Sequence, residues 1–113
     1  MLKQENKIRK VHSVSEEKAL EIKKFLQGAV RCHDKVVAGE WFSLRDLMGG
    51  ENFDWHGTPL QDLFEVYRGR SDALKMTAKS AGWLLKAAIK DDPCRLYETK
   101  KEAFTRKYRW VKK

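Results

Sequence analysis

The chain has 113 residues and a net charge of +8, and its 42% hydrophobic and 35% charged content fits one folded domain rather than a disordered tail. No apolar run approaches the roughly 18 residues of a membrane helix, and the first ten residues lack the apolar stretch of a secretory signal, so we expect a cytoplasmic protein of a bacterium or a phage-infected cell. Two cysteines, Cys32 and Cys94, make no disulfide framework and are expected to be thiols.

The charge is unevenly distributed along the chain. Residues 36–69 carry two basic and six acidic side chains, whereas residues 95–113 carry eight basic and two acidic ones. Positive charge gathered at one end attracts polyanions, of which nucleic acid is the commonest in a cytoplasm. A solvated basic tail would give the same distribution, so charge alone leaves both interpretations open.

The N-terminal part predicts an arm followed by an amphipathic helix. Residues 1–12 are expected to form a flexible basic arm. Ser13 and Glu16 have the spacing of a capping box, which predicts a helix over residues 13–35. Gly28 costs this helix about 1 kcal/mol relative to alanine, which predicts a close packing contact there. One face of the helix is apolar, through Ala19, Ile22, Phe25, Leu26, Ala29 and Val30.

The middle of the chain predicts a short extended segment and a short helix. Residues 40–42 carry two aromatic side chains and indicate extended backbone. Ser43 and Asp46 repeat the capping-box spacing and predict a helix that Gly49 and Gly50 end.

A loop and a further helix follow. We expect Phe53 and Trp55 in the loop to fold back onto the core. Thr58 and Pro59 are a hydroxyl N-cap and a proline at the first helical position, which together predict a helix start. The buried stripe of this helix is predicted to be Leu60, Leu63, Phe64 and Tyr67.

The next helix carries the strongest functional signal. Residues 70–76 are either a turn or a short helix, and Thr77 is the predicted N-cap of a helix that ends before Pro93. Its apolar face is Ala81, Leu84, Leu85 and Ala88. The opposite face carries, at steps of four, three and four, the side chains of Lys79, Trp83, Lys86 and Lys90.

After Pro93 the apolar period changes to two, which predicts a β-hairpin. Residues 99–103 are the predicted connection between its strands. The apolar face is expected to contain Cys94, Leu96, Phe104, Tyr108 and Trp110, and the other face Thr105, Lys107 and Arg109.

The order of these elements, three helices followed by a hairpin, resembles the winged helix-turn-helix superfamily over residues 43–111. Residues 76–82 resemble the start of a recognition helix in winged domains of phage and plasmid replication proteins, and residues 108–111 resemble a second wing strand. Residues 69–76 depart from the pattern, because they are longer than the turn of the simplest helix-turn-helix.

The resemblance implies a mostly helical α+β fold. A single domain over residues 13–113 would contain the N-terminal helix and a winged helix over residues 40–111. In a winged helix the exposed face of the third helix enters the major groove, and the hairpin is the wing that reaches a neighbouring phosphate or minor groove.

We therefore expect a protein that binds double-stranded DNA in a regulatory or replication role. Lysine and arginine side chains would neutralise phosphates, and Lys79 and Ser80 would lie nearest the bases. The predicted nucleic-acid-binding residues are Thr77, Lys79, Ser80, Trp83, Lys86, Lys90, Lys100, Lys101, Arg106, Lys107 and Arg109.

Other functions remain open at this point. No phosphate-binding loop, HExxH or GxSxG motif is present, so we expect no enzyme activity and no cofactor. A zinc site from Cys32, His33, His56 and Cys94 lacks a CxxC pair, and no bound metal is expected. The alternative function is a protein-interaction module or a small phage-type inhibitor on a winged-helix scaffold, and a homodimer through residues 15–31 is also predicted.

Overall fold

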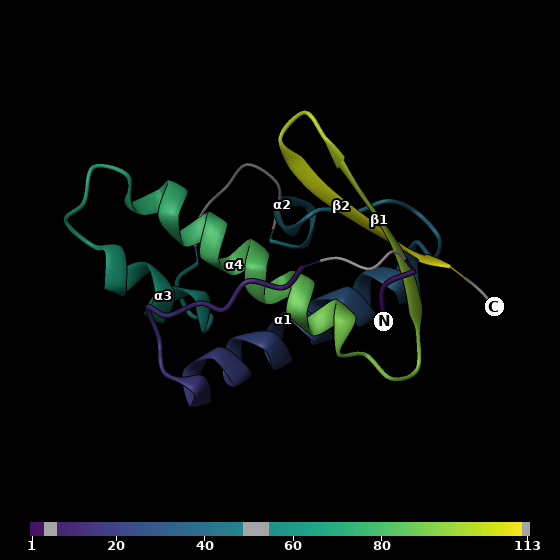
Figure 1. Ribbon diagram of the computed structural model, residues 1–113, viewed down its shortest axis with the longest axis horizontal. Coiled ribbons are helices and arrows are strands. Elements are labelled where there is room, and N and C mark those ends of the chain that lie inside the picture. The colour runs from purple at the N-terminus through teal and green to yellow at the C-terminus, as the bar shows by residue number, and fades with distance from the viewer. Residues whose placement is uncertain (4–6, 49–54, 112–113) are drawn as a thin grey trace.

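Four helices and one hairpin form the part of the chain that the structure, a computed structural model, describes, namely residues 1–3, 7–48 and 55–111 (Figure 1). This α+β architecture with more helix than strand confirms the predicted class. In chain order the elements are α1 (Glu16–Val36), α2 (Leu44–Leu47), α3 (Leu60–Tyr67), α4 (Ala73–Lys90), β1 (Leu96–Glu102) and β2 (Thr105–Val111).

Helix α4 is the centre of the domain. It packs against both α1 and α3, and Figure 1 shows it running between those helices and the hairpin. The apolar stripes predicted for α1 and α4 are buried where these two helices pack together. Each stripe lies on one helix face because its members recur every three or four residues. The buried side chains of these stripes are Ile22, Leu26, Val30, Ala81, Leu84, Leu85 and Ala88.

Two details predicted for α1 are wrong. The N-cap is Ser15 rather than Ser13, since the Ser15 hydroxyl accepts the backbone N–H of Lys18 at 3.1 Å. Both serines have suitable chemistry, so composition could not separate them. Gly28 has no packing contact either, because a Cβ built there meets nothing within 4 Å.

The predicted start of α2 is confirmed, and that of α3 is displaced by one residue. Ser43 and Asp46 form a reciprocal capping box. Helix α3 begins at Leu60 with Pro59 rather than Thr58 as its N-cap residue, although the Thr58 hydroxyl accepts the backbone N–H of Leu60 at 3.2 Å. Trp55 is buried in the core as predicted, whereas Gly49, Gly50 and Phe53 lie outside the described residues.

The predicted start of α4 is wrong. The helix begins at Ala73, and Thr77 lies in its second turn. The Thr77 hydroxyl donates a 2.8 Å hydrogen bond to the carbonyl of Ala73, and its side chain is fully buried. A threonine bonded to the carbonyl four residues earlier satisfies its hydroxyl inside a helix, so it has no need of a capping position.

The hairpin is longer than predicted. Residues 99–103 do not connect the strands, because β1 continues to Glu102 and the turn is Ala103–Phe104 alone. Both turn residues have positive φ, 49° and 68°, as two-residue hairpin turns require.

The pairing register decides which face of the hairpin is buried. Tyr97 lies opposite Trp110 and Thr99 opposite Tyr108, so the inner face of β1 carries Tyr97 and Thr99. The predicted inner position of Leu96 is wrong, since Leu96 lies on the other face. Cys94 and Phe104 are also not core residues, because both are exposed.

Two short segments extend the hairpin on either side. Phe42 pairs antiparallel with Tyr108 through two 2.8 Å backbone hydrogen bonds, which confirms the extended segment predicted over residues 40–42. Leu2 pairs parallel with Tyr97, and Val11 is buried in the core. The described residues of the arm predicted to be flexible, 1–3 and 7–12, therefore pack on the domain, because Leu2 and Val11 find partners there.

Candidate nucleic-acid interface

A groove of about 770 Å³ lies between α2, α4, the tip of the hairpin and the N-terminal arm. Its lining within the described residues contains no carboxylate. A volume of this size falls within the roughly 300–1,000 Å³ of ligand pockets. The cationic side chains that line this basic groove are Lys7, Arg9, Arg45, Lys75, Lys79, Lys86, Lys101 and Arg106.

Helix α4 supplies one wall of the basic groove. Lys75, Lys79 and Lys86 are spaced by four and seven residues, so they share a helix face opposite the buried stripe. Between them lie two small residues, Ala78 and Gly82, and a Cβ built on Gly82 meets nothing within 4 Å. This wall therefore has small side chains in the middle and ammonium groups on either side of them.

Positive charges from three separate segments meet at Lys86. Burial lowers the pKa of its ammonium, and Arg106 of β2, Arg9 of the arm and Lys90 of α4 lower it further. Like charges held close together in a partly buried site favour the binding of an anion, because a bound anion relieves their repulsion.

Trp83 lies between two cations of the basic groove. The guanidinium carbon of Arg9 is 5.7 Å, and the ammonium nitrogen of Lys79 5.5 Å, from the centre of its ring. The indole is half-buried and packs against the core, yet it also lines the groove. It therefore holds the two cations in place by cation–π contact while its remaining surface faces the cavity.

The hairpin presents different charges on its two faces. Lys101 and Arg106 are paired across the strands and line the basic groove. Lys107 and Arg109 lie one and three positions after Arg106 on β2, so the period of two turns them to the opposite face together with Lys100. The predicted wing residues are thus divided between the groove and the outer face.

The three basic residues of the outer face are paired with carboxylates. Lys100 and Lys107 lie 3.0 and 3.2 Å from the carboxylate of Glu102, and Arg109 lies 2.9 Å from that of Glu98. Hydrogen bonds from Lys100 and Lys107 lower the pKa of Glu102. These pairs reduce the positive field of the outer face relative to that of the groove.

The ring of Trp41 contacts two basic residues of the outer face. The ammonium nitrogen of Lys100 is 4.4 Å and the guanidinium carbon of Arg109 4.8 Å from its ring. On the outer face, the basic groups of Lys100, Lys107 and Arg109 therefore already interact with carboxylates or with the Trp41 ring of the same chain.

The two hydroxyl residues predicted at the interface are buried instead. Ser80 is 1% exposed, and its hydroxyl shares a 2.9 Å hydrogen bond with that of Tyr67. Thr77 is 0% exposed and bonds within α4. Their predicted contact with DNA is wrong for this arrangement, because the helix face that carries them packs against α3.

Of the other predicted residues, Lys79, Trp83, Lys86, Lys101 and Arg106 line the groove, and Lys90 is exposed near Lys86.

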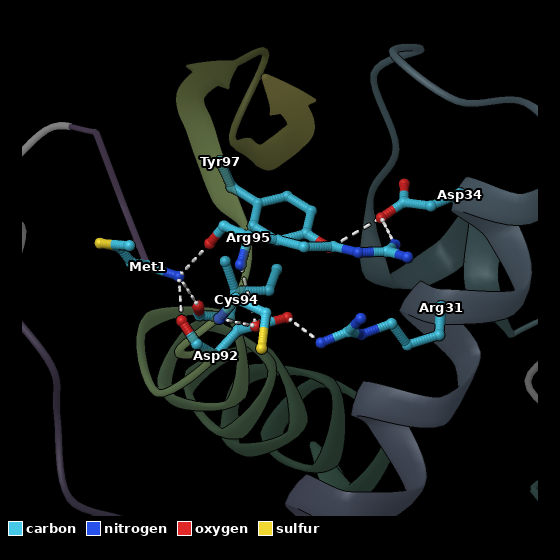
Figure 2. A network of polar contacts seen from close by, with 8 residues as sticks. Met1, Arg31, Asp34, Asp92, Cys94, Arg95 and Tyr97 are labelled. Atoms are coloured by element: carbon cyan, nitrogen blue, oxygen red, sulfur yellow. Dashed lines mark hydrogen bonds and ion pairs between the residues drawn. The ribbon is translucent and has the colours of Figure 1, made fainter. Parts of the chain in front are cut away.

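The N-terminal arm is anchored where α4 ends (Figure 2). The amino group of Met1 donates hydrogen bonds of 2.7, 2.9 and 2.7 Å to the carbonyls of Ile89, Asp92 and Arg95. A positive group at this position also complements the helix dipole of α4. Leu2 is held beside β1 and Val11 lies in the core, and Lys7 and Arg9 of the arm line the groove.

A buried polar network orients the hairpin relative to the helices (Figure 2). Asp34 of α1 accepts hydrogen bonds from the Tyr97 hydroxyl at 2.7 Å and from Arg95 at 3.2 Å. Asp92 accepts one from Arg31 at 2.8 Å. Burial and the bond to Asp34 raise the pKa of Tyr97. These hydrogen bonds join α1 to the end of α4 and to β1.

Four basic residues of the groove were not predicted: Lys7, Arg9, Arg45 and Lys75. Lys75 lies one turn before Lys79 and would have been found if α4 had been started at Ala73. The two arm residues belong to no periodic element, so their position depends on where the arm packs.

No protein-family model, curated protein or solved structure matches the chain. Among the described residues, no three histidine, cysteine, aspartate or glutamate side chains gather as metal ligands, so Cys32, His33, His56 and Cys94 form no such group. No described helix has an apolar stretch long enough to cross a bilayer.

Proposed function

We propose that the chain binds nucleic acid along the basic groove, with duplex DNA as the expected target. The observation that carries this proposal is the lining of the groove, where cations from the arm, α2, α4 and the hairpin meet without a carboxylate among the described residues. A small anion would contact two or three of these groups, whereas a phosphate backbone offers a charge to each of them.

The arrangement of the elements supports a winged-helix mode of binding. Phe42 lies antiparallel beside β2, and α3 packs on α4 just before the hairpin, as the predicted pattern requires. Because α4 begins at Ala73, the connection from α3 is residues 68–72, which is closer to the short turn of a helix-turn-helix than the predicted connection was. Helix α4 would then face the bases and the hairpin would be the wing.

The structure changes which residues are proposed to do the binding. Lys79 stays nearest the bases, and Lys75 replaces Ser80 beside it, because both lysines are exposed on the groove side of α4. Lys101 and Arg106 are the proposed phosphate contacts of the wing, together with Lys86 and the arm residue Arg9.

A homodimer through α1 is a separate part of the proposal. The apolar stripe of α1 is buried against α4 within one chain, so a second copy would have to pack on the outer face. Leu20 is the large apolar side chain of that face, 48% exposed. Sedimentation equilibrium of the parent and of Leu20→Glu, free and DNA-bound, tests this contact, and a monomer under all conditions excludes it.

The test of nucleic-acid binding compares two double variants of equal charge. Lys75→Glu/Lys79→Glu alters the groove, and Lys24→Glu/Lys35→Glu alters two exposed lysines of α1 that do not line it. Both lower the net charge by the same amount, so a general loss of attraction affects them equally.

Binding to a labelled duplex of about 20 base pairs, or two helical turns, is measured by fluorescence anisotropy. We expect the groove variant to lose binding and the α1 variant to keep most of it. An equal effect of both variants, or no binding by the parent at about 50 mM salt, contradicts the proposal.

A further inference from the structure

An aromatic side chain is almost fully exposed at the tip of the hairpin. Phe104 is 95% exposed, more than any other large hydrophobic residue in the described part of the chain. An exposed phenyl ring forgoes the stabilisation that burial provides, so its position does not help this domain to fold.

The backbone at this tip is also unfavourable for the residues that occupy it. Ala103 and Phe104 both lie in the left-handed region, with φ of 49° and 68°. Two-residue hairpin turns of this kind favour Asn-Gly, because residues with a Cβ are strained there. Glycine at position 104 would remove both the backbone strain and the exposed ring. The presence of phenylalanine there, despite the strain and the exposure, indicates a role for the phenyl group outside folding.

Phe104 lies at the mouth of the basic groove. It lines the groove together with its neighbours Lys101, Thr105 and Arg106, and Figure 1 shows the tip extending away from the body of the domain. Cations that bind a phosphate backbone would therefore bring the bases of the same strand within reach of the ring.

We propose that Phe104 stacks on a nucleobase of the bound nucleic acid and acts as an aromatic wedge at a site where a base is unpaired. This inference rests on the proposed function and names its preferred substrate, a duplex that continues into a single strand. Every base has a π-face, so such a contact recognises the junction without reading its sequence. An apolar ring that enters a base step also separates the bases, as wedges of other nucleic-acid-binding proteins do.

The main variant, Ala103→Asn/Phe104→Gly, keeps every charge and gives the turn its preferred residues. We expect it to unfold at a higher temperature than the parent while losing the stacking contact. Phe104→Trp retains an aromatic ring and should keep the contact. Val36→Ala is the matched control, because Val36 is 82% exposed but does not line the groove.

The probes are a blunt duplex and the same duplex with a single-stranded overhang, each with 2-aminopurine at the junction position. On binding the parent, the emission of 2-aminopurine in the overhang duplex should rise as its base is separated from the stack. Ala103→Asn/Phe104→Gly should abolish this rise and weaken affinity for the overhang duplex by about tenfold, the effect of losing one base–aromatic stack. Phe104→Trp and Val36→Ala should retain both signals.

The outcomes separate this inference from the proposed function. If the parent binds neither duplex, the proposed function fails. If the parent binds and Ala103→Asn/Phe104→Gly binds the overhang duplex equally well with the same emission, duplex binding stands and the wedge is excluded. Equal affinity of the parent for the two duplexes also contradicts the preference for a junction.

Discussion

Lys86 of α4 and Arg106 of β2 bring two positive charges to the same groove, although β1 separates α4 from β2 in the sequence. Burial lowers the pKa of the Lys86 ammonium, and the Arg106 guanidinium lowers it further. Like charges gathered around a partly buried ammonium group are a common feature of functional sites.

Replacing Lys86 with methionine should raise the thermal midpoint of unfolding at low salt. The pKa of this ammonium is lower in the folded than in the unfolded chain, so its charge opposes folding at neutral pH. The gain should be full below the folded-state pKa and disappear as the pH rises through it to the ordinary lysine value of 10.5. It should also shrink with added salt, which screens the repulsion. A variant that is less stable than the parent at low salt would show that Lys86 is a structural residue.

The two faces of the hairpin should differ in the salt dependence of DNA binding. Each lysine or arginine that neutralises a phosphate contributes about −0.9 to the slope of log K against log salt. Lys101→Ala/Arg106→Ala should flatten the slope by roughly 2, because both residues line the groove. Lys107→Ala/Arg109→Ala, whose partners are Glu102 and Glu98, should change it less. The reverse order would place the DNA on the outer face.

Removing the Tyr97 hydroxyl should destabilise the domain more than removing that of Tyr67. The Tyr97 hydroxyl donates to the buried carboxyl group of Asp34, whereas the Tyr67 hydroxyl bonds to the neutral Ser80. Hydrogen bonds to charged groups contribute about 1.5–3 kcal/mol and neutral ones about 0.5–1.5 kcal/mol. Urea unfolding of Tyr97→Phe and Tyr67→Phe measures both, and an equal loss would mean that Asp34 finds another partner.

Two glycine substitutions should separate helix stability from binding. Gly28 in α1 and Gly82 in α4 both lie inside helices, with open space where a Cβ would be. Alanine at either position should stabilise the domain by about 1 kcal/mol, the difference in helix propensity. Gly82→Ala should nevertheless weaken DNA binding, since Gly82 lines the groove and Gly28 does not. If both variants bind like the parent, the groove wall at Gly82 is not used by the ligand.

Features that depend on neighbours within a few residues were predictable from the sequence. The capping box of Ser43 and Asp46 and the hydrogen bond from the Leu60 N–H to the Thr58 hydroxyl involve atoms two or three positions apart, so residue order alone determines them. The apolar stripe from Ala81 to Ala88 was also predicted, because burial of one helix face repeats with the helical period. Lys79 and Lys86 followed as the face opposite that stripe.

Features that depend on distant partners were decided by the tertiary structure. Thr77 has the chemistry of an N-cap, yet packing of α4 against α3 buries it in the second turn. The strand register, rather than the charge of the hairpin, turns Lys101 and Arg106 toward α4 and Lys107 and Arg109 away from it. The arm has no period at all, and Arg9 reaches Trp83 because Leu2 pairs with β1 and Val11 enters the core. Local hydrogen bonds and periodic burial are encoded over a few residues, whereas the basic groove exists only once α2, α4, the hairpin and the arm have packed together.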